Sequence, residues 1–509
     1  MIALKRTAYL SVAISTIVLT GCLSGGGGGG GGGGDDAGFV CETQGDTADG
    51  AREQQFRIDN CDFRITDEDL KAAEFTSLAG YESATQRSGV LNDALYRIEV
   101  PENWNGQLVM WAHGFRGGEG TSLTVDNPPN REQLLELGYA WAASSYRANY
   151  YDVKVGVEDT NRLALNFSDI TGLAEPTKFL IAGYSMGGHV TGAAIEPENR
   201  QVLAEADLDV NYSAAMPMCG VMGDTTLFDY FGAYNLALFE LGGDGADIFP
   251  ADDVATKLAT ARSNLWIDYD ANPNANGLQG SGFVLYQILQ NLSGGERPVY
   301  PFGFGGYQET LQDLADSDGT IDGILTDQGV DTSYITYRFE SDQLQPNLPE
   351  TPYSAGQTQQ ELFVNASIYR AVPEPDANGP RGIGELRWIP KINGEFTIPV
   401  LTLHNLGDLF VPFSMQQIYR QRAINNGNPN LLVQRAIRSV VHCEFTTAEV
   451  EEAFTDLVAW EQNIAAIPAG DDVLDAAAVA EDDFGCAFTR GDRLVMQGLP
   501  TCASFQVPL

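Results

Sequence analysis

The sequence predicts an α/β protein built on a mostly parallel, doubly wound β-sheet with a large, mainly helical insertion. Short apolar runs alternate with helical stretches between residues 94 and 218, and the same rhythm resumes from residue 396. Such alternation is typical of parallel strands joined by crossover helices that cover both faces of a sheet. In addition, a glycine-flanked serine directly follows the apolar run at 177–183, which predicts a sharp turn from strand to helix.

The sheet elements follow in chain order from residue 94. Residues 94–100 alternate apolar and polar side chains, which predicts a half-buried strand, and residues 107–112 form an apolar run, which predicts a buried one. The other elements expected of the core are strands at 139–144, 177–183, 212–218, 396–403 and 436–441 and helices at 67–73, 131–137, 157–167, 414–425 and 447–460.

The alternation of strands and helices is interrupted between residues 223 and 395. This stretch is rich in aromatic residues, and long loops of Gly, Asn, Asp and Pro separate helical segments at 227–241, 254–265, 283–292 and 359–371. Because it interrupts the sheet on the side that carries the serine, we expect it to form a lid over a pocket. The alternative is an independent domain inserted for stability or partner binding.

The first residues form a targeting segment. A basic pair precedes an apolar stretch at 8–20 that is too short to cross a bilayer comfortably, and Leu19-Thr20-Gly21-Cys22 resembles the lipobox of bacterial lipoproteins. The resemblance implies a lipid anchor on the Cys22 thiol in a Gram-negative cell envelope, facing the periplasm or the surface, and Leu23 favours the outer membrane. The alternative is an ordinary cleaved signal peptide. The glycines at 25–34 predict a flexible tether.

These features divide the chain into six segments. We expect a lipoprotein signal peptide at 1–21, a lipidated cysteine and tether at 22–36, an N-terminal extension at 37–89, a first core part at 90–222, a lid insertion at 223–397 and a second core part with a disulfide-bonded tail at 398–509. The N-terminal extension carries no motif that indicates a chemistry.

The charge of the chain excludes some classes of partner. The formal net charge is −40, and the acidic residues are spread along the chain instead of forming one tail. Nucleic acids and anionic membrane surfaces are bound by basic patches, so neither is expected as a partner.

The cysteines indicate disulfides instead of a metal site. Apart from Cys22, the chain has six cysteines, an even number that suits an oxidising compartment and allows about 15 pairings. Closeness in sequence favours the pairs Cys41 with Cys61 and Cys486 with Cys502, which leaves Cys219 with Cys443. No Cys/His cluster has zinc spacing. Two Asp-rich stretches, 268–274 and 316–322, lack the closing carboxylate of a calcium loop and are interpreted as turns.

The pentapeptide Gly183-Tyr184-Ser185-Met186-Gly187 is the candidate nucleophile turn. A serine on such a turn exposes its hydroxyl at the edge of the sheet, and glycines on both sides avoid clashes with the neighbouring strand and helix. A serine hydroxyl needs a histidine base, which a carboxylate must orient in turn. Ser185 is therefore the expected nucleophile.

The base and the acid follow from chain order. Enzymes with this turn carry nucleophile, acid and base in that order, and His442 is the histidine of the four that can follow an acid placed after a late strand. We expect His442 to lie directly after the strand at 437–441. The acid chosen is Asp408, in the loop after the preceding strand, with Asp224 and Asp229 as alternatives.

Two backbone N–H groups are expected to bind the oxyanion. One belongs to Met186, which follows the nucleophile, and the other to Phe115 in the loop after the strand at 107–112, with Arg116 as the alternative donor. The three remaining histidines are expected to support the structure; they are His113, His189 and His404.

These motifs resemble the α/β-hydrolase superfamily. The resemblance covers about 90–220 and 398–462, where it rests on His113-Gly114-Phe115, Gly183-x-Ser185-x-Gly187, Asp408 and His442. Tyr184-Ser185-Met186-Gly187-Gly188 and the segment that begins at His442 are similar to secreted bacterial esterases and serine peptidases. Cys443 resembles the feruloyl esterase and tannase group, in which a disulfide ties the histidine loop to the nucleophile region. Because Tyr184 stands where that group has a cysteine, the resemblance makes Cys219 the partner of Cys443.

The resemblance implies an exported hydrolase of carboxylic esters that works through an acyl-enzyme and needs no cofactor. Candidate substrate-binding residues are Arg116, Tyr184 and Arg147. One alternative is a serine peptidase on the same scaffold, because ester and amide cleavage use the same triad. The other is a binding or adhesion lipoprotein with an inactive hydrolase body.

Overall fold

The computed structural model of the chain describes residues 65–117, 122–317, 329–340, 356–379, 384–491 and 502. The predicted signal peptide, the lipidated Cys22, the glycine tether and the pair Cys41 and Cys61 lie outside the described residues. None of the helices in the described part of the chain combines the length and the apolar character that a bilayer crossing needs.

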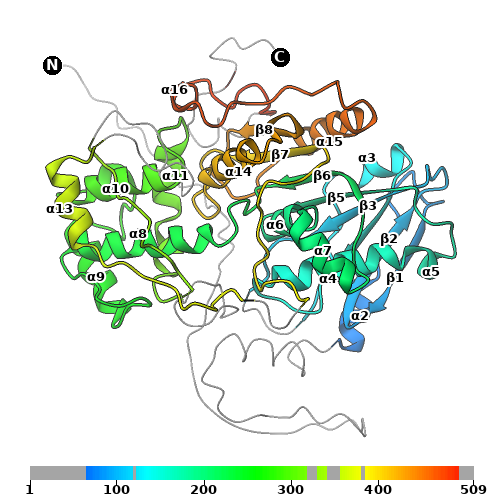
Figure 1. Ribbon diagram of the computed structural model, residues 1–509, viewed down its shortest axis with the longest axis horizontal. Coiled ribbons are helices and arrows are strands. Elements are labelled where there is room, and N and C mark those ends of the chain that lie inside the picture. The colour runs from blue at the N-terminus through cyan, green and yellow to red at the C-terminus, as the bar shows by residue number, and fades with distance from the viewer. Residues whose placement is uncertain are drawn as a thin grey trace, which may run out of the picture. The chain divides into compact units, whose positions relative to one another are not determined.

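An eight-stranded sheet runs through the core (Figure 1). In spatial order its strands are β1 (Thr85–Leu91), β2 (Ala94–Val100), β4 (Ala140–Ser144), β3 (Gln107–Ala112), β5 (Lys178–Tyr184), β6 (Tyr212–Met218), β7 (Val400–Asn405) and β8 (Leu432–Ile437). The strands from β3 to β8 are parallel, whereas β1 and β2 pair antiparallel at one edge. This mostly parallel, doubly wound sheet confirms the predicted α/β-hydrolase fold.

Helices cover both faces of the sheet. On one face α4 (Val153–Leu165) and α6 (Met186–Ala193) pack against each other and against β3 to β6. On the other face α3 (Arg131–Glu136) and α15 (Thr447–Gln462) are joined by the Gln133 amide, which donates to the Glu451 carbonyl at 2.8 Å. Successive side chains of a strand point to opposite faces, so both faces of a buried strand must be apolar or small.

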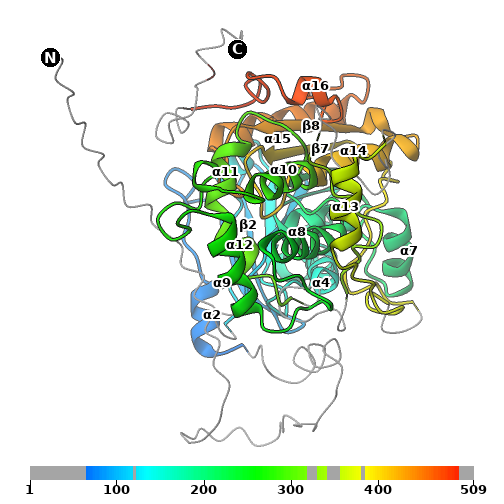
Figure 2. The same cartoon turned by 90° about the vertical axis from the view of Figure 1, so that its left-hand side faces the viewer.

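The insertion between β6 and β7 is built around one long apolar helix, α8 (Thr226–Gly242), which is buried along most of its length. Figure 2 shows α8 end-on with the other helices of the insertion around it. These are α9 (Val254–Leu265), η1 (Ala275–Gly277), α10 (Gly282–Leu292), α11 (Tyr300–Gly306), α12 (Gln308–Gln312) and α13 (Gln359–Ser367). The remaining helices of the chain are α2 (Asp67–Ala73), α5 (Phe167–Thr171), α7 (Pro197–Glu205), α14 (Ser414–Asn425), η2 (Pro429–Leu431) and α16 (Ala476–Val479).

Two strands differ from the sequence-based expectation. Strand β1 was not expected, because residues 85–91 lack a clear alternation; it forms a hairpin with β2 through Asn92 and Asp93, both of which have positive φ. Strand β8 ends at Ile437, so the expected strand at 436–441 is wrong over residues 438–441. These four residues form a loop, and His442 therefore does not follow the strand directly.

A buried carboxylate begins α4. Asp152 is the N-cap residue, and its Oδ1 accepts a hydrogen bond from the Val155 N–H at 3.1 Å. Its other oxygen, Oδ2, is buried and has no hydrogen-bond partner among the described residues. Burial raises the pKa of Asp152 to about 7, although the nearby Arg147 acts in the opposite direction. The folded protein therefore holds a proton on this group at pH values where the unfolded chain has lost it.

We expect the variant Asp152→Asn to change the pH dependence of stability. In the wild type, the contribution of Asp152 to the free energy of unfolding should fall as the pH rises from about 4 to about 7, because the unfolded chain releases this proton at a lower pH than the folded protein. The buried histidines act in the opposite direction in both proteins. Asn keeps the N-cap acceptor but does not titrate, so the free energy of unfolding at pH 7 minus that at pH 4 should be roughly 2–4 kcal/mol more positive in the variant than in the wild type. Urea unfolding at both pH values measures this difference. Asp475→Asn, at the exposed N-cap of α16, is the control. An unchanged slope in Asp152→Asn would contradict the prediction.

Candidate active site

The glycine-flanked serine occupies the predicted turn between strand and helix. Ser185 lies between the end of β5 and the start of α6, with φ 57° and ψ −120°. A Cβ on Gly183 would lie 2.3 Å from the Gly187 carbonyl oxygen, and a Cβ on Gly187 would lie 2.0 Å from the Ala112 carbonyl oxygen. Only glycine fits at these two positions, so the packing of α6 on β3 and β5 forces Ser185 into its strained conformation.

The structure brings Ser185, His442 and Asp408 together. The distance between Ser185 Oγ and His442 Nε2 is 2.8 Å, and His442 Nδ1 forms a short hydrogen bond with Asp408 Oδ2. An imidazole that carries its proton on Nδ1 donates a hydrogen bond to the carboxylate, and its Nε2 is then free to accept the serine proton. Asp408 is fully buried, whereas the His442 side chain is 21% exposed.

The loop that follows β7 fixes the Asp408 carboxylate. Asp408 Oδ1 accepts hydrogen bonds from the backbone N–H groups of Phe410 and Val411 at 3.0 and 3.1 Å. His404 supports the same loop, because its Nε2 donates to the Val411 carbonyl at 2.9 Å while its Nδ1 accepts from the Gln416 amide. Burial lowers the pKa of His404 to about 4, so the ring is neutral and suited to this pair of bonds.

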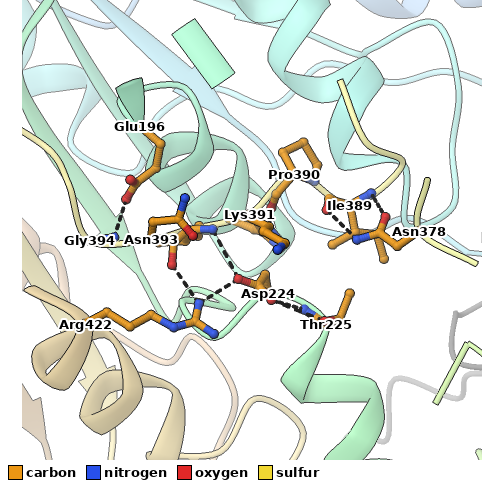
Figure 3. Close-up of polar contacts among 12 residues, drawn as sticks. Glu196, Asp224, Thr225, Asn378, Ile389, Pro390, Lys391, Asn393, Gly394 and Arg422 are labelled. Atoms are coloured by element: carbon orange, nitrogen blue, oxygen red, sulfur yellow. Dashed lines mark hydrogen bonds and ion pairs between the residues drawn. The ribbon is translucent and has the colours of Figure 1, made fainter. Parts of the chain in front are cut away.

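The two alternative acids have other partners. Asp224 accepts hydrogen bonds from Arg422 at 2.6 Å and from the Ile392 N–H at 3.2 Å, and Figure 3 shows it facing Arg422. Asp229 accepts from the Asp331 N–H at 2.7 Å and from the Tyr334 hydroxyl at 2.8 Å. Both residues therefore tie the start of the insertion to its returning segments and to α14.

The loop after β3 lies beside the nucleophile. A Cβ on Gly114 would approach Ser185 Cβ to 3.2 Å, so the backbone of this loop is in contact with the serine. The expected donors of Phe115 and Met186 belong to the two segments that flank Ser185, and their role as an oxyanion site stays a prediction. His113 is buried and stacks on Tyr146 with ring centroids 4.0 Å apart.

Both remaining histidines are structural groups. Burial lowers the pKa of His113 to about 4 and that of His189 to about 4. His189 lies on α6 and is completely buried, as expected of a histidine that supports the structure. Its Nε2 donates to the Pro390 carbonyl at 2.8 Å, and its Nδ1 accepts from the Tyr151 hydroxyl at 3.1 Å.

A disulfide joins the end of β6 to the histidine loop. Cys219 and Cys443 are bonded, with their Cα atoms 5.3 Å apart, as the sequence favoured. Cys443 Sγ lies 3.3 Å from His442 Nε2. Both sulfurs belong to the S–S bond, so this group of two cysteines and a histidine offers no thiolate for a metal. Cys486 is bonded to Cys502, and the two disulfides indicate an oxidising compartment outside the cytoplasm.

The candidate substrate-binding residues are occupied in the structure. Arg147 pairs with Asp159 at 2.5 Å and with Glu158, both on α4, so its proposed contact with a substrate carboxylate is not supported. Arg116 pairs with Asp126 at 2.5 Å. Tyr184 packs its ring between two aromatic residues, with centroids 5.0 Å from Trp111 and 5.6 Å from Phe445, which supports the segment after His442.

The structure adds aromatic residues that the sequence left unassigned. Phe410 lies edge-on to His442 at 5.6 Å, and Phe231 of α8 stacks on Phe410 at 5.8 Å. From there the ring contacts continue through Phe228 and Tyr151 to Phe115 of the loop after β3. We call these residues the aromatic chain; it connects the histidine loop with the loop after β3 by way of the insertion. The aromatic content of residues 228–239 was the available signal, but its partners Phe410 and Tyr151 lie far away in sequence.

Comparison with known proteins gives distant similarities. No protein-family model matches the chain. The chain is 24% identical over 395 residues to an o-phthalyl amidase of Xanthobacter agilis, a match that covers 72% of this chain and 85% of that protein.

Solved structures show weak likeness. An arylesterase is 11% identical, with a TM-score of 0.34, and the match covers 82% of this chain and 93% of that one. Feruloyl esterase B of Aspergillus oryzae is 13% identical, with a TM-score of 0.38, and the match covers 79% and 86% of the two chains. An acylaminoacyl peptidase of Pyrococcus horikoshii is 10% identical, with a TM-score of 0.35, and the match covers 77% and 44%.

Proposed function

We propose that this chain is a serine hydrolase that cleaves acyl compounds through a covalent acyl-enzyme. Its sheet and its strand-to-helix turn have the arrangement of the α/β-hydrolase fold. The observation that carries the proposal is the hydrogen-bonded series from Ser185 through His442 to Asp408. A buried series of this kind makes the hydroxyl a nucleophile at neutral pH.

The reaction has two steps on the same residues. Ser185 Oγ forms a bond to the acyl carbon while its proton passes to His442 Nε2, and the negative oxygen is bound by the N–H groups of Phe115 and Met186. Collapse of this intermediate expels the leaving group, which takes the proton from His442. A water molecule then attacks the acyl-enzyme by the same route, with His442 as the base, and releases the acid and free Ser185.

We propose a carboxylic ester with an aromatic or bulky apolar acyl group as the substrate. The aromatic chain supports this choice, because Phe410 contacts the His442 ring and Phe115 belongs to the loop that lies beside Ser185. Aromatic side chains bind flat apolar groups over a large area. The chain as a whole is strongly acidic, and this disfavours an anionic polymer as the substrate.

An amide of an aromatic acid is the second candidate substrate. The relative from Xanthobacter agilis is called an o-phthalyl amidase, and it aligns over most of its length with this chain. Amide and ester cleavage share the same residues and differ in how readily the leaving group departs, so the site geometry is compatible with both.

Labelling with a fluorophosphonate, followed by a substrate panel, tests the proposal. The purified wild-type protein should bind the label covalently, because only an activated serine attacks the phosphorus. Turnover of p-nitrophenyl acetate and p-nitrophenyl benzoate, compared with benzoyl and phthalyl anilides, then decides between ester and amide. A folded protein that neither labels nor turns over any of these compounds would support the alternative of an inactive binding lipoprotein.

A further inference from the structure

Part of the insertion surrounds the loop that carries the triad acid. We call residues 293–307 the acid cradle and residues 406–414 the acid loop. The Ser414 N–H donates to the Ser293 carbonyl at 3.0 Å, so the cradle is bonded to the end of the acid loop. A Cβ on Gly303 would lie 2.2 Å from the Gly407 carbonyl oxygen, so α11 is in backbone contact with the residue before the acid. The cradle therefore touches the acid loop at both ends.

Arg297 is the central residue of the acid cradle. Its Nε donates to the Leu406 carbonyl at 2.6 Å, Nη1 donates to the Gly295 carbonyl at 2.8 Å, and Nη2 donates to Ser293 Oγ at 3.1 Å. The side chain is 2% exposed, and no carboxylate of the described residues forms an ion pair with it. Such a buried cation is costly unless a negative charge lies nearby.

Asp408 is the nearby negative charge. Burial lowers the pKa of Arg297 to about 10, and the charge of Asp408 opposes that effect, as do the hydroxyls of Tyr300, Tyr230 and Tyr286. The guanidinium remains protonated at neutral pH. It therefore acts on Asp408 through space while its own hydrogen bonds hold the backbone of the acid loop.

Tyr230 of α8 contacts the acid loop directly. Its side chain is buried, and its hydroxyl donates to the carbonyl of Leu409, the residue after the triad acid, at 2.9 Å. Tyr307 lies between α11 and α12. Burial, and then the charge of Asp408, raise the pKa of Tyr307 well above the usual range. The insertion thus contacts the acid loop from three of its own helices and loops.

We propose that Arg297 and Tyr230 are positioning residues for the relay of Ser185, His442 and Asp408. The inference rests on the proposed function, and it gives the insertion a role besides the predicted covering of the substrate. Tyr230 fixes the backbone directly after Asp408, and Arg297 fixes the backbone before it and compensates the charge of Asp408. The insertion is then needed for turnover of even the smallest ester, which makes no contact with a lid.

The variant Tyr230→Phe, which removes the hydrogen bond to the Leu409 carbonyl, tests the positioning role. With p-nitrophenyl acetate, kcat should fall about 10- to 100-fold while KM stays within about twofold, because small displacements of a relay lower the rate of the chemical step without weakening binding. Tyr337→Phe is the matched control. The Tyr337 hydroxyl donates to the Ala233 carbonyl at 3.2 Å in the same insertion, with no bond to the acid loop. Its kcat should stay within about twofold of the wild type.

Two substitutions of Arg297 provide a measurement that a purely structural role would not change. Arg297→Gln removes a positive charge near the relay, so the relay should take up a proton more readily. The acidic limb of the pH profile of kcat should therefore move to higher pH. Arg297→Lys keeps the charge and should keep the limb in its wild-type position, even where kcat is lower. The titratable groups that interact with Arg297 from the packed elements include Tyr230, Tyr286, Tyr300, His404 and Asp408.

The possible outcomes separate this inference from the proposed function. If the wild type labels with fluorophosphonate and Tyr230→Phe or Arg297→Gln, folded by circular dichroism, keeps wild-type kcat and pH profile, the inference is wrong and the proposed function stands. A wild type that does not label overturns both. If one of the two variants fails to fold, the other still decides, because they act on different contacts of the acid loop.

Discussion

Ser185→Ala is expected to lower kcat for p-nitrophenyl esters by about 10⁶-fold and to abolish fluorophosphonate labelling. The substitution removes the atom that forms the acyl bond, and the remaining oxyanion donors and substrate contacts cannot replace it. The small Ala side chain fits the turn, since Ser185 and Ala differ only in the hydroxyl, so the fold should remain intact. Steady-state kinetics and labelling on one preparation measure both effects.

The control for this variant is Ser213→Ala. Ser213 lies on the neighbouring strand β6, where its hydroxyl donates to the Phe179 carbonyl at 3.3 Å, away from the relay. Its kcat should stay within a few-fold of the wild type. A Ser185→Ala protein that retained more than about 1% of wild-type kcat would rule out the serine as the nucleophile.

Asp408→Asn is expected to lower kcat by about 10⁴-fold with little change in KM. Oδ1 of Asp408 accepts two backbone hydrogen bonds, from Phe410 and Val411, so the amide oxygen of Asn should take that place and its NH₂ should face His442. The imidazole must then accept at Nδ1 and carry its proton on Nε2, which is the tautomer that cannot accept a proton from Ser185. Comparison of kcat and KM on p-nitrophenyl acetate measures the effect.

The variant Asp229→Asn tests whether Asp229, one of the alternative acids, takes the place of Asp408 in the relay. Asp229 accepts hydrogen bonds from the Asp331 N–H and the Tyr334 hydroxyl inside the insertion, without a bond to His442. The variant should keep kcat within a few-fold of the wild type, although it loses some stability. The assignment of Asp408 fails if the two variants show the opposite order of activity.

The residues of the relay could be predicted from the sequence because the serine turn has a local signal and the order of strands along the chain limits the choice of base and acid. The glycines at 183 and 187 are required by contacts within one turn, and the apolar runs before Ser185 and Asp408 predict buried strands whose ends meet at one edge of the sheet. The cysteine pairing followed from counting and closeness in sequence, and the described disulfides Cys219–Cys443 and Cys486–Cys502 agree with it.

The partners of individual side chains could not be predicted in this way. Arg147 looked available for a substrate carboxylate, but the folded chain brings Asp159 of α4 to it. The loop 438–441 was assigned to a strand because its residues are apolar enough for one. In both cases the local pattern was compatible with two arrangements, and packing selected one.

By itself the sequence predicted the fold class, the serine turn and the three residues that the structure brings together, since the strand and turn patterns are local and their order along the chain limits which histidine and which acid can follow the serine. Only the tertiary structure decided that the insertion supports the acid, because Arg297 meets Leu406 across 109 positions of the chain. Contacts of that separation depend on how α11 packs against the acid loop, and no periodicity or motif in either segment encodes the pairing.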